Sequence, residues 1–148
     1  MARVFQSFIY NFLKAERPDL AIERERFHWR AESDSKATLE LLPVMETDVS
    51  IYKGDRHIIL DTKFYRQTFG DRFGVKKLHV EHLYQLFAYL SNSNPQKVQC
   101  QGILLYPTVE TDLNAQFSVL GFPITVRTLN LAQPWQGIHS DLLSLIPT

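Results

Sequence analysis

The start of the chain carries apolar side chains at helical spacing. They recur every three or four positions and would form one stripe: Val4, Phe5, Phe8, Ile9, Phe12 and Leu13. A stripe of this kind is typical of a helix that packs one face against a core. Pro18 lacks a backbone N–H and indicates that this helix has ended before it.

The next segment alternates between aromatic and polar residues. Phe27 and Trp29 are two positions apart, which predicts a strand. The polar stretch 31–36 predicts a loop, and residues 38–42 predict a short strand that ends at Pro43.

Two β-rich segments, 45–52 and 56–65, flank the dipeptide Gly54-Asp55 and predict a hairpin. The remaining elements follow from the same criteria: a loop at 66–77, a helix at 78–90, a strand at 98–106, a hairpin of 117–120 and 124–129, and a closing helix at 138–146. The order α-β-β-β-α-β-β-β-α predicts an α/β fold with a central mixed sheet flanked by helices. Since no repeat or linker interrupts the 148 residues, we expect one domain, 1–148.

Composition limits the classes of function. The 16 basic and 16 acidic residues cancel, so any contact with DNA must come from a local basic cluster. The single cysteine, Cys100, excludes an internal disulfide and suits a reducing compartment. No apolar run approaches the roughly 20 residues of a membrane span, and no secretory cleavage site follows the first helix. We therefore expect a cytoplasmic protein without membrane contact.

The hairpin brings two carboxylates together. If Gly54 and Asp55 form its loop, Asp48 lies opposite Asp61, with Cβ atoms about 5 Å apart. Lys63 is two residues beyond Asp61 and shares its face. Two carboxylates this close repel each other, and a divalent cation between them removes that penalty.

This arrangement suits Mg²⁺, which binds a few carboxylate oxygens and keeps open positions for phosphate and water. Lys63 can orient or help deprotonate the attacking water and can neutralise charge that develops on the phosphate. The pattern therefore predicts hydrolysis of a phosphodiester. The alternative is a pair of ordinary strand-end carboxylates beside a solvated lysine, because so short a pattern also recurs by chance.

Further polar residues could support this centre. Gln85 and Tyr89 are spaced i, i+4 on the second predicted helix, with His82 on the same face. They could support a metal centre, contact the DNA backbone, or simply form the polar side of the helix. The basic residues nearest the hairpin could contact phosphates or belong to a solvated loop. They are Arg66, Arg72, Lys76 and Lys77.

Three segments, 45–51, 58–65 and 82–90, together carry these motifs in a fixed order. In this order they closely resemble the nuclease domain of the McrC family, the cleavage subunits of McrBC restriction systems for modified cytosine. Further similarity is found at Trp29, 102–107, Trp135 and 141–143. The resemblance covers nearly the whole chain.

The resemblance implies a restriction-endonuclease-like PD-(D/E)xK fold, as in the C-terminal domain of McrC. It implies that Asp48 and Asp61 bind the metal ion and that Lys63 is the catalytic lysine. We also include Thr62, between the last two, among the predicted metal ligands.

The helical Gln-x-x-x-Tyr of related RecB-like nucleases is matched by Gln85 and Tyr89, which the resemblance makes supporting residues. It further implies Mg²⁺ as cofactor, with Mn²⁺ as a substitute, and DNA as substrate. The implied partner is a McrB-like, GTP-hydrolysing subunit that recognises methylated sites and drives cleavage. Because cutting both strands needs two centres, a homodimer is a further expectation.

The sequence departs from the family at two points. Family members often carry a glutamate in the first helix, where this chain has Gln6, which we count as a supporting residue. A neutral amide there would weaken one acidic support of the metal centre. Family members also carry a substantial N-terminal region that meets the GTPase. Here the nuclease domain begins close to Met1, as expected of either a fragment or a stand-alone relative.

Four hypotheses follow. The first is a Mg²⁺-dependent DNA endonuclease, and the second is a non-catalytic DNA-binding or assembly module of a restriction complex. The third is a nuclease for single strands or RNA, and the fourth is an α/β domain without an active centre.

Overall fold

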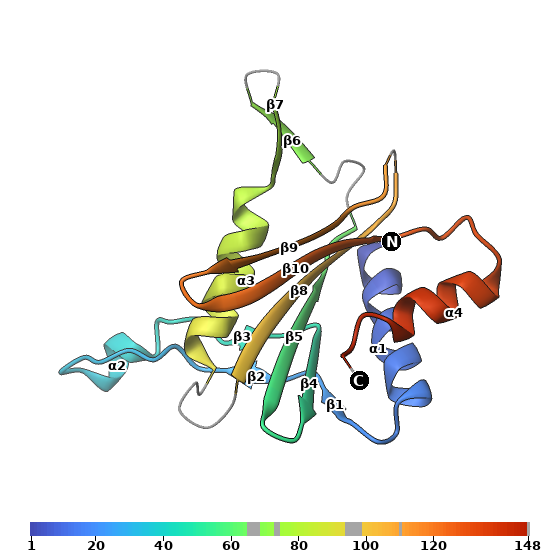
Figure 1. Ribbon diagram of the computed structural model, residues 1–148. Helices are drawn as coiled ribbons and strands as arrows, with labels where there is room; N and C mark the ends of the chain where they lie inside the picture. The colour runs from blue at the N-terminus through green and yellow to red at the C-terminus, as the bar shows by residue number, and fades with distance from the viewer. Residues whose placement is uncertain (65–68, 73–74, 94–98, 110, 148) are drawn as a thin grey trace.

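A six-stranded mixed sheet crosses the molecule in the computed structural model (Figure 1). The structure describes residues 1–64, 69–72, 75–93, 99–109 and 111–147. Across the sheet the strands are β1 (Ala21–Glu23), β4 (Val49–Lys53), β5 (Arg56–Thr62), β8 (Gln99–Pro107), β10 (Phe122–Leu129) and β9 (Asn114–Val119). The pairs β5–β8 and β8–β10 are parallel and the others antiparallel. The predicted central mixed sheet is thus confirmed.

Helices cover both faces of this sheet (Figure 1). The helices α1 (Ala2–Glu16) and α4 (Trp135–Leu143) pack on one face, and α3 (Val80–Asn92) packs on the other. The side chains of strand β5 alternate between the two cores, since Leu60 points toward α1 and Ile59 toward α3. None of the described helices is long and apolar enough to cross a membrane.

The hairpin β4–β5 has the predicted register. Its pairs run from Lys53 with Arg56 to Val49 with Leu60, around a loop of Gly54 and Asp55. Gly54 adopts a φ of 59°, a conformation that glycine accepts without steric cost. The ladder ends at the pair Val49 and Leu60, so the predicted pairing of Asp48 with Asp61 lies one position beyond its last pair.

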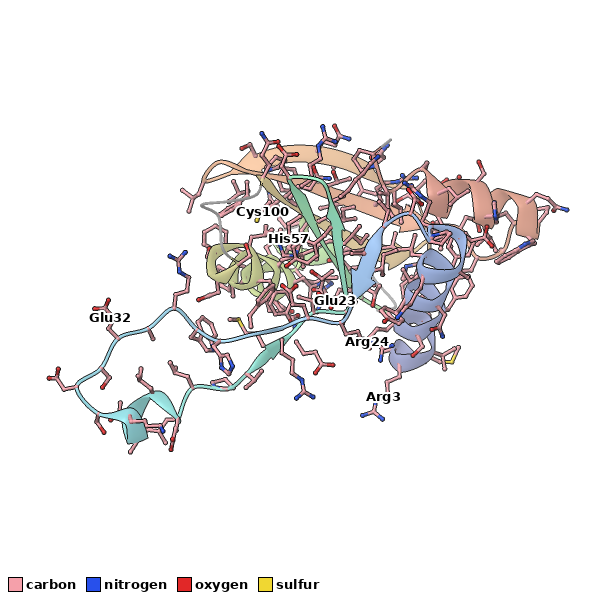
Figure 2. The ribbon with its side chains drawn as sticks, turned by 90° about the horizontal axis from the view of Figure 1, so that it is seen from below. Arg3, Glu23, Arg24, Glu32, His57 and Cys100 are labelled. Carbon is pink, nitrogen blue, oxygen red and sulfur yellow. The ribbon has the colours of Figure 1, made fainter. Side chains whose placement is uncertain are left out.

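The strand predicted at 38–42 is wrong. Residues Lys36–Leu39 form a short helix, α2, whose N-cap Ser35 accepts a hydrogen bond from the Thr38 amide at 3.4 Å. Leu41 is 81% exposed, so an extended segment here would have no core to cover. The segment 28–44, which carries α2, extends away from the sheet (Figure 2).

The loop predicted at 66–77 is wrong for every described residue of that segment. There β6 (Phe69–Arg72) and β7 (Val75–Leu78) pair as a separate two-stranded ribbon. A second small ribbon joins β2 (Arg26–Phe27) to β3 (Met45–Glu46). The sequence analysis also missed β1, whose three residues are too few to show a period.

The hairpin β9–β10 confirms the prediction near the C-terminus, with its turn one residue earlier than expected. Leu120 and Gly121 form the two-residue loop and have φ values of 49° and 85°. Positive φ at both positions is typical of the turns that match the twist of antiparallel strands.

Candidate active site

Asp48 is held by two elements that approach it from different sides. The backbone amide and the hydroxyl of Thr62 both donate to its Oδ2 at 2.8 Å. The Nε2 of Gln6 in α1 donates to its Oδ1 at 2.6 Å. Both carboxylate oxygens therefore have fixed directions before any cation is bound.

Asp61 is the most unusual charged group of the site, because its side chain is almost fully buried, with 1% of the residue exposed. Lys63 Nζ lies 3.1 Å from Asp61 Oδ2, but among the described residues no donor is aligned to hydrogen-bond that oxygen. Burial, and next the charge of Asp48, raise the pKa of Asp61 to about 7, against the opposing effect of Lys63. The ionised form of Asp61 is therefore electrostatically unfavourable at neutral pH, and a bound cation would stabilise it.

Lys63 completes a compact group with Asp61. Its backbone amide donates to the Leu105 carbonyl at 2.9 Å, which extends the alignment of β5 with β8 by one residue. Its ammonium also donates to Gln85 Oε1 on α3. Two partners thus hold the ammonium beside the carboxylate pair.

The side-chain amide of Gln85 also begins a chain of hydrogen bonds. Gln85 Nε2 donates to the Tyr89 hydroxyl at 2.8 Å, and that hydroxyl donates to the Glu46 carbonyl at 3.1 Å. Burial raises the pKa of Tyr89 to about 12, so the hydroxyl stays neutral and keeps its proton to donate. The chain joins Lys63 to β3, two residues before Asp48, and gives Gln85 and Tyr89 a structural place beside the candidate centre.

His82 lies one turn before Gln85 and is buried, with its Nδ1 2.7 Å from the Tyr106 hydroxyl on β8. Burial, and next the charge of Lys63, lower the pKa of His82 to about 4. A neutral imidazole therefore ties α3 to β8 at the level of the candidate centre.

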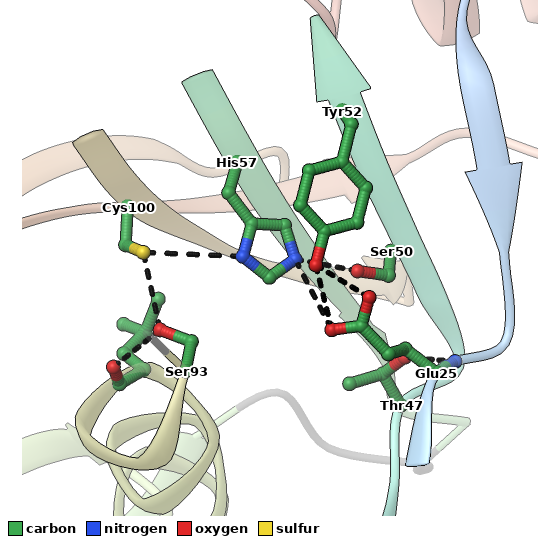
Figure 3. Close-up of polar contacts among 8 residues, drawn as sticks. Glu25, Thr47, Ser50, Tyr52, His57, Ser93 and Cys100 are labelled. Carbon is green, nitrogen blue, oxygen red and sulfur yellow. Dashed lines mark hydrogen bonds and ion pairs between the residues drawn. The ribbon is translucent and has the colours of Figure 1, made fainter. Parts of the chain in front are cut away.

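A second polar cluster, which the sequence analysis missed, fixes the residue before Asp48 (Figure 3). Glu25 donates its backbone amide to the Thr47 hydroxyl at 3.0 Å and accepts from the Thr47 amide at 2.9 Å. The Tyr52 hydroxyl is 2.7 and 2.5 Å from the two Glu25 carboxylate oxygens. These contacts anchor the segment between β3 and β4 to the chain that follows β1.

His57 lies in the same cluster, with its ring stacked on Tyr52 and its Nε2 2.5 Å from the Ser50 hydroxyl (Figure 3). Burial lowers the pKa of His57 to about 4, so the ring is neutral at physiological pH. Ser50 is completely buried and cannot meet a substrate. This serine-histidine pair is therefore a structural contact and not a nucleophile with its base.

The predicted basic residues are described only in part. Arg66 lies outside the described residues, and for Arg72 and Lys76 only the strand positions in β6 and β7 are described. Lys77 is exposed on β7. Their contact with DNA remains a prediction.

The donor set suits a hard cation with open positions. Among the described residues no group of three or more His, Cys, Asp or Glu side chains is arranged to hold a metal ion. The candidate is therefore the pair Asp48 and Asp61, whose few oxygens leave room for water and phosphate, as Mg²⁺ requires. Thr62 donates to Asp48 through its amide and hydroxyl, and its role as a ligand stays a prediction.

Comparison with known proteins identifies the family of the chain. Residues 1–107 match the family described as McrBC 5-methylcytosine restriction system component. The chain is also 37% identical over 146 residues to a protein of Escherichia coli (strain K12) named type IV methyl-directed restriction enzyme EcoKMcrBC. That alignment covers 98% of this chain and 42% of the relative, so the chain spans less than half of the relative's length.

Proposed function

The chain belongs to the McrBC family of restriction-system components, as the motifs of the hairpin and of α3 indicated, and on that premise we propose that it is a metal-dependent DNA nuclease domain. Its centre is a PD-(D/E)xK site made of Asp48, Asp61 and Lys63. The whole chain, 1–148, forms this one domain. The buried Asp61 carboxylate carries the proposal, because one of its oxygens finds no aligned donor within the described part of the chain while a second carboxylate and an ammonium lie beside it.

Each residue has a distinct role in this proposal. Asp48 and Asp61 hold Mg²⁺, or Mn²⁺ in its place, with the Asp48 oxygens oriented by Gln6 and Thr62. The bound cation supplies Lewis-acid polarisation of the scissile phosphate and lowers the repulsion between the carboxylates.

Lys63 acts on the water and on the phosphate. Its ammonium, held between Asp61 and Gln85, orients the attacking water and neutralises the charge that grows on the phosphate oxygens. Gln85 and Tyr89 are positioning residues, since they reach the reacting groups only through Lys63 and the Glu46 carbonyl.

In this proposal partner subunits recognise the DNA site and regulate its cleavage. We propose that a GTP-hydrolysing, McrB-like subunit selects sites with modified cytosine and delivers the DNA to this domain. Cleavage of both strands then requires two copies of the centre, which a homodimer supplies.

Plasmid nicking tests the catalytic proposal. The protein, alone and with a GTPase partner, is incubated with supercoiled DNA in Mg²⁺, in Mn²⁺ and in EDTA. Nicking should require metal and fall at least about 100-fold in Asp61→Ala and Lys63→Ala, as losses of a main transition-state contact do. Asp55→Ala, in the exposed hairpin turn, is the matched control and should cut normally.

The alternative is a non-catalytic DNA-binding or assembly module. One observation favours it, namely that the helix α1 places the neutral amide of Gln6 and not a carboxylate against Asp48. A protein that binds DNA but does not nick it in Mg²⁺, in Mn²⁺ or in EDTA would support this alternative.

A further inference from the structure

One face of α1 carries basic and polar side chains in a line. Arg3, Ser7, Tyr10 and Lys14 follow one another at spacings of three or four residues, so they share a face. Arg3 and Lys14 are exposed, and the Lys14 ammonium donates to the Tyr10 hydroxyl at 3.1 Å. At 1.5 Å per residue the line is about 17 Å long.

Arg24 lies across this line. It follows β1, and its Nη2 donates to the Ser7 hydroxyl at 3.4 Å. Its guanidinium carbon is 4.7 Å from the centre of the Tyr10 ring, a cation–π contact. Figure 2 shows Arg3 and Arg24 near the same end of α1. These contacts hold an arginine from another element beside the cations of the helix.

The three cations differ from two other arginines of the chain in their ion pairing. Among the described residues no carboxylate forms an ion pair with Arg3, Lys14 or Arg24, whereas Arg17 pairs with Asp19 and Arg26 with Glu46 within 3.0 Å. In a chain with no net charge this is a local excess of positive charge. Exposed, unpaired cations along one line suit a polyanion better than a single small anion.

The line passes the candidate centre. Gln6, which donates to Asp48 at 2.6 Å, directly precedes Ser7. Arg24 follows Glu23, which pairs with Ser50, so it lies directly after the end of β1 and next to the start of β4. A polyanion bound along α1 would therefore run beside the carboxylate pair.

We propose that Arg3, Lys14 and Arg24 form a phosphate-binding ridge that seats the backbone of a DNA strand as it passes Asp48. At a rise of 3.4 Å per nucleotide the ridge covers about five nucleotides. The identity of the partner as DNA rests on the proposed function. The ridge itself is separate from the basic segment 66–77, since it lies on α1 and beside β1.

Fluorescence anisotropy with a labelled 20-base-pair duplex in EDTA tests the ridge without cleavage. The double variant Arg3→Gln/Arg24→Gln should lower affinity at least about tenfold at low salt and reduce the slope of log K against log salt by about 2. Arg30→Gln/Lys36→Gln removes two exposed charges from the segment 28–44 and is the matched control. Its affinity and slope should stay within about twofold of the original.

Two further variants separate charge from fold. Arg24→Lys keeps the positive charge and should keep the salt slope. Arg3→Gln alters an exposed side chain, so the variant should fold normally and lower the slope by about 1. Equal slopes for the unaltered protein and both arginine-to-glutamine variants would overturn the ridge.

Binding and cleavage can fail independently. Ridge-dependent binding by a protein that never nicks DNA supports the ridge and contradicts the proposed nuclease. Nicking that proceeds normally in the double variant, with unchanged binding, supports the nuclease and removes the ridge.

Discussion

Replacing Asp61 with asparagine should stabilise the metal-free protein, although it removes a residue of the candidate centre. Burial and the neighbouring charge of Asp48 raise the pKa of Asp61 from 3.8 to about 7. Between these pH values the folded protein keeps a proton that the unfolded chain has released. The free energy of unfolding therefore falls as pH rises through this window, and the loss is complete above about pH 7.

The size of the effect follows from the two pKa values. Their difference corresponds to a loss in the free energy of unfolding of about 4 kcal/mol at pH 8 and of less than about 2 kcal/mol at pH 5. The attraction between Asp61 and Lys63 is already contained in the raised pKa of Asp61, so it is not subtracted again. Asp61→Asn should therefore be more stable than the unaltered protein by about 4 kcal/mol at pH 8 and by less than about 2 kcal/mol at pH 5.

Urea unfolding in EDTA at both pH values measures this difference, with tryptophan fluorescence as the probe. Asp55→Asn makes the same chemical change in the exposed hairpin turn and should alter stability by less than about 0.5 kcal/mol at either pH. Addition of Mn²⁺ or Mg²⁺ should stabilise the unaltered protein by about 1.4 kcal/mol for each tenfold excess over the dissociation constant. The Asp61 variant should lose most of this response.

The reasoning would be refuted by an Asp61→Asn variant that is less stable than the original at pH 8. It would equally be refuted by a gain of the same size at both pH values, because burial of a charge cannot then be its source.

Three further changes probe the surroundings of the site. Tyr89→Phe removes the hydroxyl that donates to Glu46, and should lower the nicking rate at least about tenfold at a cost of only about 1 kcal/mol in urea unfolding; unchanged nicking would show that the chain to Lys63 does not position it. Gly102→Ala places a methyl group 2.8 Å from a methyl carbon of Leu86, and calorimetry should show a loss of about 1–3 kcal/mol; an unchanged melting temperature would contradict this close packing. Leu120→Asn suits the positive φ of the β9–β10 turn and should raise the free energy of unfolding by about 0.5–1 kcal/mol. A lower melting temperature of this variant would contradict a backbone strain at Leu120.

The register of the β4–β5 hairpin could be predicted because a two-residue loop leaves few choices of pairing. Gly54 marked that loop, and the apolar residues on either side had to face the cores. The two longest apolar stripes likewise predicted α1 and α3. In each case the deciding interactions lie within a few residues or follow a clear period.

The features that residue spacing alone could not predict depend on contacts between distant segments. Gln6 and Asp48 are 42 residues apart, and nothing in their spacing shows that a helix delivers one to the other. The same holds for Glu25 and Tyr52, which are 27 residues apart. The short helix α2 begins at a single capping bond to Ser35. The weak β pattern of 38–42 led to a strand being predicted there instead.

The candidate centre consists of two mechanically distinct parts. Asp48, Asp61 and Lys63 belong to one hairpin and its immediate flanks, whereas Gln6 and Gln85 come from helices on opposite faces of the sheet. A shift of either helix would therefore change the direction of an oxygen or of the ammonium while leaving the hairpin register intact. Such an arrangement would let the orientation of the candidate site be adjusted from the outer surface of the domain without separating the two carboxylates.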